Sequence, residues 1–378
     1  MKIIKIHKHI TFFDFRCRLY LTVLSFAFSV FLPFCIYAQK DSLAKKHRFL
    51  VLPIVARSIE TDWSFGIAFS GTFHLKSPTD TVTRTSNLQA LSLYTLRNQF
   101  VAAINGSIYF PREKYILSQQ VSYSYFPDKF WGLGSETPDS NEESYSYQQF
   151  YVYLHPQRLI GNKFFIGLLY EFQKVWNVQY QAGGLFDKEQ ILGRYGYAAS
   201  GLGLSFTYDN RNNAFAPDRG MMLQFHFDHF DNILGSTYRY TNYVIDLRKF
   251  WRLYKQQVLA VQAFGYFNIG EVPLRSLASL GGANSMRGYY SGRYRDQNLY
   301  VLQSEYRIPL FWRLGCVVFG DLGNVTSKWG EFNFESLKYT YGAGIRFALS
   351  KSERLNLRLD YGIGHGSHGF YFQLGEAF

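Results

Sequence analysis

The residues of this chain whose types and spacing permit specific chemistry lie between positions 280 and 325. The stretch holds a glycine-rich segment with one arginine, an alternating segment with one glutamate, and a third segment with one aspartate just before a glycine: Arg287-Gly288-Tyr289, Glu305, and Asp321 with Gly323. An arginine guanidinium is planar and suits bidentate pairing with carboxylates. The glycines of the loop allow its backbone to turn sharply and to approach a wall closely. The chemistry indicated is ion pairing between a folded-back loop and the strands behind it.

Alternation along the two strands decides which side chains share a face. Around Glu305, the side chain of Leu302 would lie on the opposite, apolar face. Around Asp321, the same holds for Leu322. We therefore expect Glu305 and Asp321 to line one interior wall as partners of Arg287. The alternative is a solvated loop arginine beside two channel-lining acids.

Composition favours strands with one apolar and one polar face. Aromatic residues make up 19% of the chain, while the mean hydropathy is only −0.15. This combination fits transmembrane β-strands. Period-two alternation, clearest in 354–361, is also typical of a soluble β-sandwich. Strands of about 11–14 residues, against about 5–6 in sandwiches, and an export signal favour the barrel.

We therefore predict an all-β fold, a 16-stranded antiparallel transmembrane β-barrel of the outer membrane with an infolded sixth extracellular loop. The predicted strands are 48–57, 64–75, 84–95, 99–110, 115–126, 146–156, 162–176, 195–208, 220–231, 237–251, 255–268, 298–309, 314–323, 338–349, 354–363 and 369–378. An even number of strands leaves both termini on the periplasmic side. The long polar links then all fall on the outer side: 127–145, 177–194, 269–297, which is the sixth outer loop, and 324–337.

The domain organisation predicted is a signal peptide over 1–38, a short periplasmic lead over 39–47 and the barrel over 48–378. Basic residues precede an apolar run at 19–38, and an acceptable cleavage site ends at Ala38. An uncleaved signal anchor is the alternative; a lipoprotein signal is disfavoured by the bulky residue before the second cysteine. Cleavage leaves Cys316 as the last cysteine and excludes a disulfide.

Charge points to a membrane partner. The formal net charge is +12, of which about +8 stays with the chain after cleavage. A positive balance suits attraction to the anionic groups of outer-membrane lipid and lipopolysaccharide. No basic helix or basic cluster is present in the sequence, so nucleic acid is not an expected partner.

The carboxyl end is predicted to be a signal for barrel insertion. Phe370, Phe372, Leu374 and Phe378 would share one face of a last strand, and a terminal aromatic strand is what the outer-membrane insertion machinery reads. The alternative is an ordinary edge strand, although an unpaired apolar edge is an aggregation hazard unless the barrel closes over it.

The sequence gives no sign of an enzyme. No Ser/His/Asp set has a recognisable spacing. His226 and His229 lie three apart on a predicted strand and so point to opposite faces, which argues against joint metal ligation. His365 and His368 lack a third ligand. No metal site and no cofactor are expected.

Several of these segments resemble the BamA/TamA superfamily of outer-membrane barrels, the bacterial surface antigen type. Residues 285–289 resemble the arginine-glycine-aromatic signature of the sixth extracellular loop, 302–309 the strand after it, and 319–323 the aromatic-x-Asp-x-Gly motif. The periplasmic turn motif is matched by Asp209, Arg211, Pro217 and Gly220, although Asn212 stands where an acid is common. The resemblance is specific over 200–378 and generic before that.

The resemblance implies a role in inserting or translocating proteins or other polymers at the outer membrane of a Gram-negative cell. The proposed mechanism combines a weak seam between first and last strands with a loop locked by Arg287. One departure matters: residues 39–47 are too few for a POTRA domain, so this would be a POTRA-less member and substrate capture would need a separate periplasmic partner. The alternatives are a passive pore or surface antigen, and a membrane anchor for a periplasmic partner.

Overall fold

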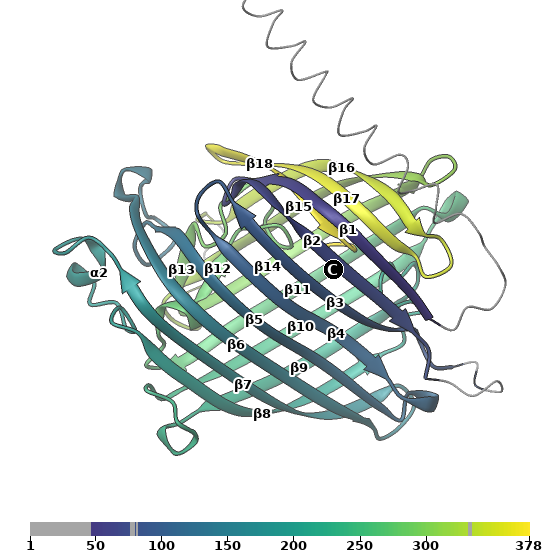
Figure 1. Cartoon of the computed structure of the whole chain (residues 1–378), viewed down its shortest axis with the longest axis horizontal. Coiled ribbons are helices and arrows are strands. Elements are labelled where there is room, and N and C mark those ends of the chain that lie inside the picture. The colour runs from purple at the N-terminus through teal and green to yellow at the C-terminus, as the bar shows by residue number, and fades with distance from the viewer. Residues whose placement is uncertain (1–46, 76–79, 81, 332–334) are drawn as a thin grey trace, which may run out of the picture. The chain divides into compact units, whose positions relative to one another are not determined.

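The computed structural model describes residues 47–75, 80, 82–331 and 335–378. The predicted signal peptide and its cleavage site at Ala38 lie outside the described residues and stay a prediction. The described chain forms a 16-stranded antiparallel sheet and a small two-stranded sheet (Figure 1). No helix among the described residues is both long and apolar enough to cross a membrane.

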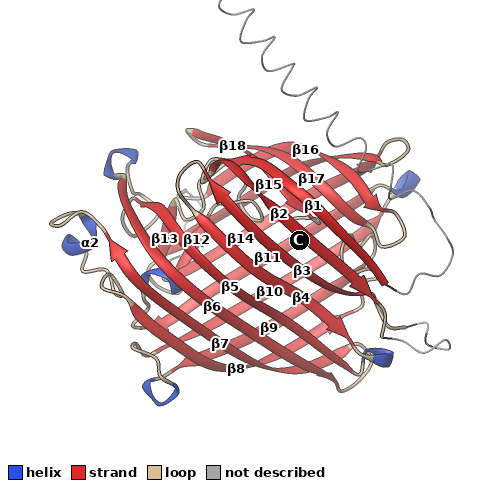
Figure 2. Cartoon of the chain, viewed as in Figure 1, coloured by secondary structure: helices blue, strands red, loops and turns tan. Residues whose placement is uncertain are grey.

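Strands dominate the described structure, and the helical segments are single turns between them (Figure 2). The strands are β1(His47–Ser58), β2(Asp62–Phe73), β3(Ser86–Thr95), β4(Phe100–Tyr109), β5(Tyr115–Phe130), β6(Glu143–Leu159), β7(Phe164–Gln179), β8(Tyr197–Asp209), β9(Gly220–Phe230), β10(Tyr240–Arg252), β11(Val258–Gly270), β12(Ala278–Leu280), β13(Tyr294–Asp296), β14(Asn298–Pro309), β15(Leu314–Thr326), β16(Lys338–Ser350), β17(Leu355–Gly364) and β18(Ser367–Leu374). The helical turns are α2(Leu185–Lys188) and the 3-10 segments Pro111–Glu113, Asp139–Asn141, Asn232–Leu234, Tyr254–Gln256 and Leu274–Ser276.

The sheet is polar inside and apolar outside. On β14, Leu302 is 50% exposed while Glu305, three residues on, is fully buried. Asp246 of β10 and Gln262 of β11 are buried, whereas Leu247 is exposed. An apolar outer face around a polar interior is what a strand crossing a lipid bilayer requires. The predicted 16-stranded antiparallel barrel is therefore confirmed, and the soluble sandwich is excluded.

Strands of the barrel pair in sequence order. The one exception among the described strands is that β11 pairs with β14, because β12 and β13 form the separate small sheet. β1 and β18 lie against each other where the sheet meets itself (Figure 1). No backbone ladder joins these two strands in the part of the chain that the structure describes. The barrel is thus nearly closed, with a seam between its first and last strands.

Long and short connections separate to a large extent. One end of the barrel, here called the long-loop end, carries the connections 131–142, 180–196, 271–297 and 327–337. At this end the side chains of α2 and the strand ends form an aromatic cluster that includes Phe130, Phe186 and Tyr197. The opposite, short-turn end has two longer links as well, 74–85 and 210–219. The third long connection contains β12 and β13, which the alternation pattern had not indicated.

The last residues correct one expectation. β18 ends at Leu374, and Gly375 at φ 92° reverses the chain. Phe378 then packs against Phe250 and Ala260, with 6% of its surface exposed. The expectation that Phe378 shares a face with Phe370, Phe372 and Leu374 is therefore wrong.

The physical reason is a set of polar contacts that holds the tail inside the barrel. Arg346 Nε donates to the carboxylate of Glu376 at 2.7 Å, and Asn356 Nδ2 donates to the same group at 2.7 Å. Arg307 Nη2 donates to the backbone oxygen of Phe378 at 3.1 Å. Glu376 interrupts the apolar series between Leu374 and Phe378, but alternation alone does not show that the chain reverses there.

Phe378→Ala should lower the stability of the folded barrel by about 3 kcal/mol, because the change leaves a cavity beside Phe250 and Ala260. Urea titration of the barrel in lipid vesicles, followed by gel mobility, measures this loss. Phe311→Ala is the control, since Phe311 is 69% exposed in a short turn. Equal midpoints for the two variants would contradict the packed position of Phe378.

Candidate functional site

Arg287 lies at the centre of a buried group of charges inside the barrel. Its Nη1 donates to Glu305 Oε1 at 2.7 Å and to Asp360 Oδ2 at 2.8 Å. All three side chains have no exposed surface. The guanidinium carbon also lies 3.6 Å from the centroid of the Phe319 ring. The two carboxylates and the aromatic face compensate the charge of this buried cation. Both ion pairs use Nη1, while Nε and Nη2 find no hydrogen-bond partner among the described residues.

The second carboxylate differs from the one expected. Arg287 pairs with Asp360 of β17, whereas Asp321 accepts a hydrogen bond from Thr340 Oγ1 at 3.2 Å. The reason is the register of β14 and β15. The residue opposite Glu305 is Phe319. Asp321 lies two residues further along β15, toward the long-loop end, and is opposite Gln303. Asp321 still acts on Arg287 through its charge without forming an ion pair with it.

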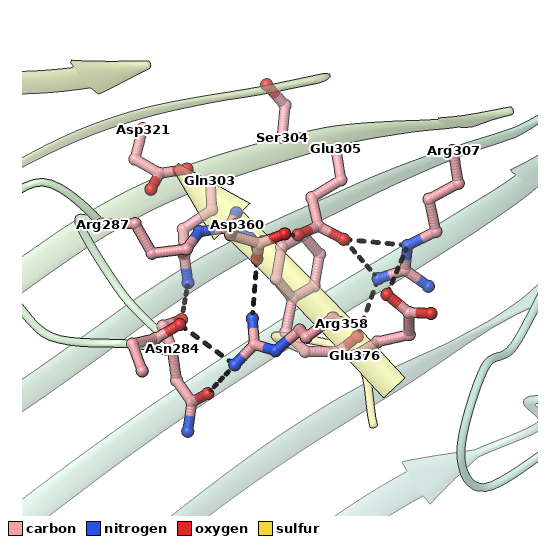
Figure 3. Close-up of polar contacts among 12 residues, drawn as sticks. Asn284, Arg287, Gln303, Ser304, Glu305, Arg307, Asp321, Arg358, Asp360 and Glu376 are labelled. Carbon is pink, nitrogen blue, oxygen red and sulfur yellow. Dashed lines mark hydrogen bonds and ion pairs between the residues drawn. The ribbon is translucent and has the colours of Figure 1, made fainter. Parts of the chain in front are cut away.

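Further arginines extend the group toward the tail, as Figure 3 shows. Arg307 Nε donates to Glu305 Oε2 at 2.8 Å. Arg346 Nη1 donates to Asp360 Oδ1 at 2.5 Å, and its Nε binds Glu376 of the tail. Each carboxylate that holds Arg287 is therefore shared with a second arginine. Burial alone would lower the pKa of Arg287, but the carboxylates of Glu305, Asp321 and Asp360 together raise it.

Arg358 ties the same group to the start of the loop. Its Nη1 donates to Asp360 Oδ2 at 3.2 Å. Its Nη2 donates to the backbone oxygen of Ala283 at 3.0 Å and to Asn284 Oδ1 at 2.5 Å (Figure 3). Arg358 therefore fixes the part of the glycine-rich segment that precedes Arg287.

Backbone contact explains the glycine after the arginine. Gly288 has φ 122°, and a Cβ added there would lie 2.6 Å from the backbone nitrogen of Gly364. A Cβ added at Gly362 would lie 2.4 Å from the oxygen of Arg287. The ring of Tyr289 then covers Gly364, within 3.0 Å of the Cβ position. The loop backbone therefore lies directly on β17, a contact that only glycines permit.

The loop also contacts the wall opposite to β14 and β17. The carboxylate of Asp128, near the end of β5, accepts from Tyr290 Oη at 2.9 Å and from Arg295 Nη2 at 3.1 Å. Tyr145 Oη donates to the same carboxylate at 2.8 Å. Burial and the adjacent carboxylate raise the pKa of Tyr290, so its phenol stays a hydrogen-bond donor. Residues 287–295 thus span the lumen between two groups of strands.

The predicted turn motif at the short-turn end forms a second, separate cluster. Asp209 accepts from Arg211 Nε at 2.9 Å and from Arg84 Nη1 at 2.6 Å. Gly220 has φ 102°, and a Cβ there would lie 2.6 Å from the oxygen of Asn210. Pro217 is buried in the same turn. These residues close a turn and do not contact the site around Arg287.

Gly323, the last of the predicted lumen residues, has a packing role. It pairs with Val301 in the ladder of β14 and β15. A Cβ there would lie 2.8 Å from the oxygen of Tyr300 and 2.9 Å from Val301 Cγ2.

Sequence reasoning missed residues of two kinds. Arg358 and Asp360 lie two apart on an alternating strand, so their shared polar face was a usable signal. Glu60, Asp128 and Arg84 lie at strand ends or turns, where no periodic signal exists. No group of three or more potential ligands suited to a metal ion occurs among the described residues.

Comparison with known proteins identifies the family. The Omp85 superfamily domain matches residues 89–378. The chain belongs to the Omp85 superfamily. The match confirms the BamA/TamA resemblance and makes the chain an outer-membrane barrel of this type. A search of the curated proteins finds no match.

Solved structures agree with this family fold. The Omp85 barrel is similar to BamA from Haemophilus ducreyi lacking POTRA domains 1–3, at 14% identity and TM-score 0.54, over 88% of this chain and 70% of that one. It is also similar to CdiB from Acinetobacter baumannii, at 13% identity and TM-score 0.56, over 88% and 60%. CdiB from Escherichia coli is similar at 11% identity and TM-score 0.53, over 89% of this chain and 61% of that one. The chain thus spans between 60% and 70% of the length of these structures.

Asp360→Asn should destabilise the Omp85 barrel far more than Asp321→Asn. The first change removes a carboxylate from three buried arginines and should cost about 3–5 kcal/mol. The second removes one acceptor and should cost about 1 kcal/mol. Urea midpoints of both variants in vesicles decide between them. A larger loss for Asp321→Asn would show that Asp321, not Asp360, is the principal partner of Arg287.

Proposed function

We propose that this Omp85 barrel assists the insertion of other proteins into the outer membrane, or the translocation of proteins or other polymers across it. The observation that carries the proposal is the seam between β1 and β18, where no backbone ladder is present in the described chain. A barrel that only holds a passive pore open gains nothing from an unpaired seam, since closure of the sheet removes its edges.

The contacts of the loop support the same function. Arg287 and Asp128 fix opposite ends of residues 287–295 across the lumen. We propose that this loop holds the resting barrel closed and is displaced during activity. Neither the loop nor the charge cluster includes a catalytic set, and the proposal assigns the barrel no enzymatic role.

The proposed partners are those that fit the apolar outer face, the last strand and the short-turn end of the barrel. Outer-membrane lipid and lipopolysaccharide would surround the apolar outer face, on which Phe370 is 51% exposed. Phe370, Phe372 and Leu374 of β18 would be read by the barrel-insertion machinery, without Phe378. A separate periplasmic protein would deliver the substrate to the short-turn end.

The test is single-channel conductance in planar bilayers, for the wild type beside Arg287→Ala. We expect a nearly closed or flickering wild type, and more frequent openings once Arg287 no longer fixes the loop to Glu305 and Asp360. Arg57→Ala is the matched control, because Arg57 forms an exposed ion pair with Asp62 at the barrel surface.

Two other outcomes would contradict the proposal. Equal, large and steady conductance of wild type and Arg287→Ala would make the chain a passive pore. Normal levels of other barrel proteins in cells depleted of this chain, together with loss of one periplasmic enzyme from the membrane, would make it an anchor.

A further inference from the structure

The seam between β1 and β18 needs something other than a backbone ladder to keep it shut. We propose that residues 288–291 form an internal staple, which binds β18 with one end and the β1–β2 turn with the other. The staple makes the loop and the seam open together. The inference deepens the proposed function, since it names the contacts that an opening barrel must break.

The first end of the staple binds β18. The backbone nitrogen of Gly288 donates to Tyr371 Oη at 2.9 Å, and Tyr371 Oη donates to the oxygen of Tyr289 at 3.2 Å. Ser367 Oγ donates to the oxygen of Gly288 at 2.6 Å. Tyr371 is 1% exposed, so water does not compete for these bonds.

The second end binds the turn that joins β1 to β2. The backbone nitrogen of Ser291 donates to Glu60 Oε1 at 2.9 Å. Glu60 is 8% exposed, and its backbone oxygen accepts from Gln99 Nε2 at 3.0 Å, which fixes the turn to the next hairpin. A hydrogen bond to a buried carboxylate is stronger than one between neutral groups.

A close contact between the two edges lies at the same end of the seam. A Cβ added at Gly369 of β18 would lie 2.7 Å from Ile59 Cγ2 in the β1–β2 turn. Toward the short-turn end, β18 stops at Leu374 and the chain turns inward. The staple therefore acts at the long-loop end of the seam, where the two edges touch.

Contacts of Arg287 and Tyr290 also hold the staple in position. Arg287, just before it, binds Glu305 and Asp360. Tyr290, within it, binds Asp128 on the opposite wall. A displaced loop would lose its contacts with Tyr371 and Glu60 together, because only two residues separate Gly288 from Ser291.

Hydrogen exchange of the barrel in vesicles tests the staple without any substrate. Tyr371→Phe removes two of the three hydrogen bonds at one end, and Glu60→Ala removes the other end. Each change should raise the exchange rate of β1 and β18 amides about tenfold. The amides of β8 to β10 should exchange at the wild-type rate. Tyr153→Phe is the matched control, because Tyr153 of β6 contacts His155, away from the loop and from both edge strands.

One result would overturn the staple: faster exchange of 287–291 in both variants with unchanged exchange of β1 and β18. A second measurement asks whether a disulfide across the seam restores slow exchange in Tyr371→Phe. In a chain with all three cysteines replaced by serine, Ile59→Cys with Gly369→Cys should form a disulfide, since the contact lies within disulfide range. The disulfide should return the exchange of both edge strands in Tyr371→Phe to the wild-type rate.

The two proposals fail separately. Coupled exchange with no effect of depletion on other barrel proteins would leave the staple standing and refute the proposed function. An assembly defect with uncoupled exchange would do the reverse.

Discussion

The ion pairs of Arg287 with Glu305 and Asp360 are the interaction on which the rest of the site depends. Three fully buried charges are stable only if each is compensated, because the loss of hydration costs several kcal/mol for each ion. The barrel provides this compensation with shared partners, since Arg307 also binds Glu305 and Arg346 also binds Asp360. Displacing the loop therefore leaves both carboxylates paired, which lowers the cost of moving it.

That arrangement is possible because the barrel is polar inside. In a soluble protein the alternating strands would bury their apolar faces, and a charge cluster of this size would be confined to the surface. Here the lipid takes the apolar faces, and the lumen is left to hydrogen bonds and ion pairs. The aromatic cluster around Phe186 then fills the long-loop end, where loops rather than lipid supply the apolar surface.

Sequence periodicity predicted the features of the barrel that repeat along the chain. It predicted the sixteen strands, the opposite facing of Glu305 and Leu302, and the long connection between β11 and β14, because each depends on alternation or on counting. Periodicity failed at Asp321. Whether Arg287 pairs with Asp321 or with Asp360 depends on how register and curvature bring β17 near β14, and alternation does not predict this. Periodicity failed at Phe378 because one left-handed residue, Gly375, reverses the chain, and alternation does not predict such a turn.

The tail and the loop meet in the same charge cluster. Arg346 binds both Asp360, which holds Arg287, and Glu376, which holds the tail inside the barrel. Arg307 likewise contacts Glu305 and the oxygen of Phe378. β18 is therefore restrained by the loop through Ser367 and Tyr371, and at its short-turn end by the tail. Both restraints lead to the carboxylates of Glu305 and Asp360, so the position of the last strand and the position of the loop are set by one group of charges.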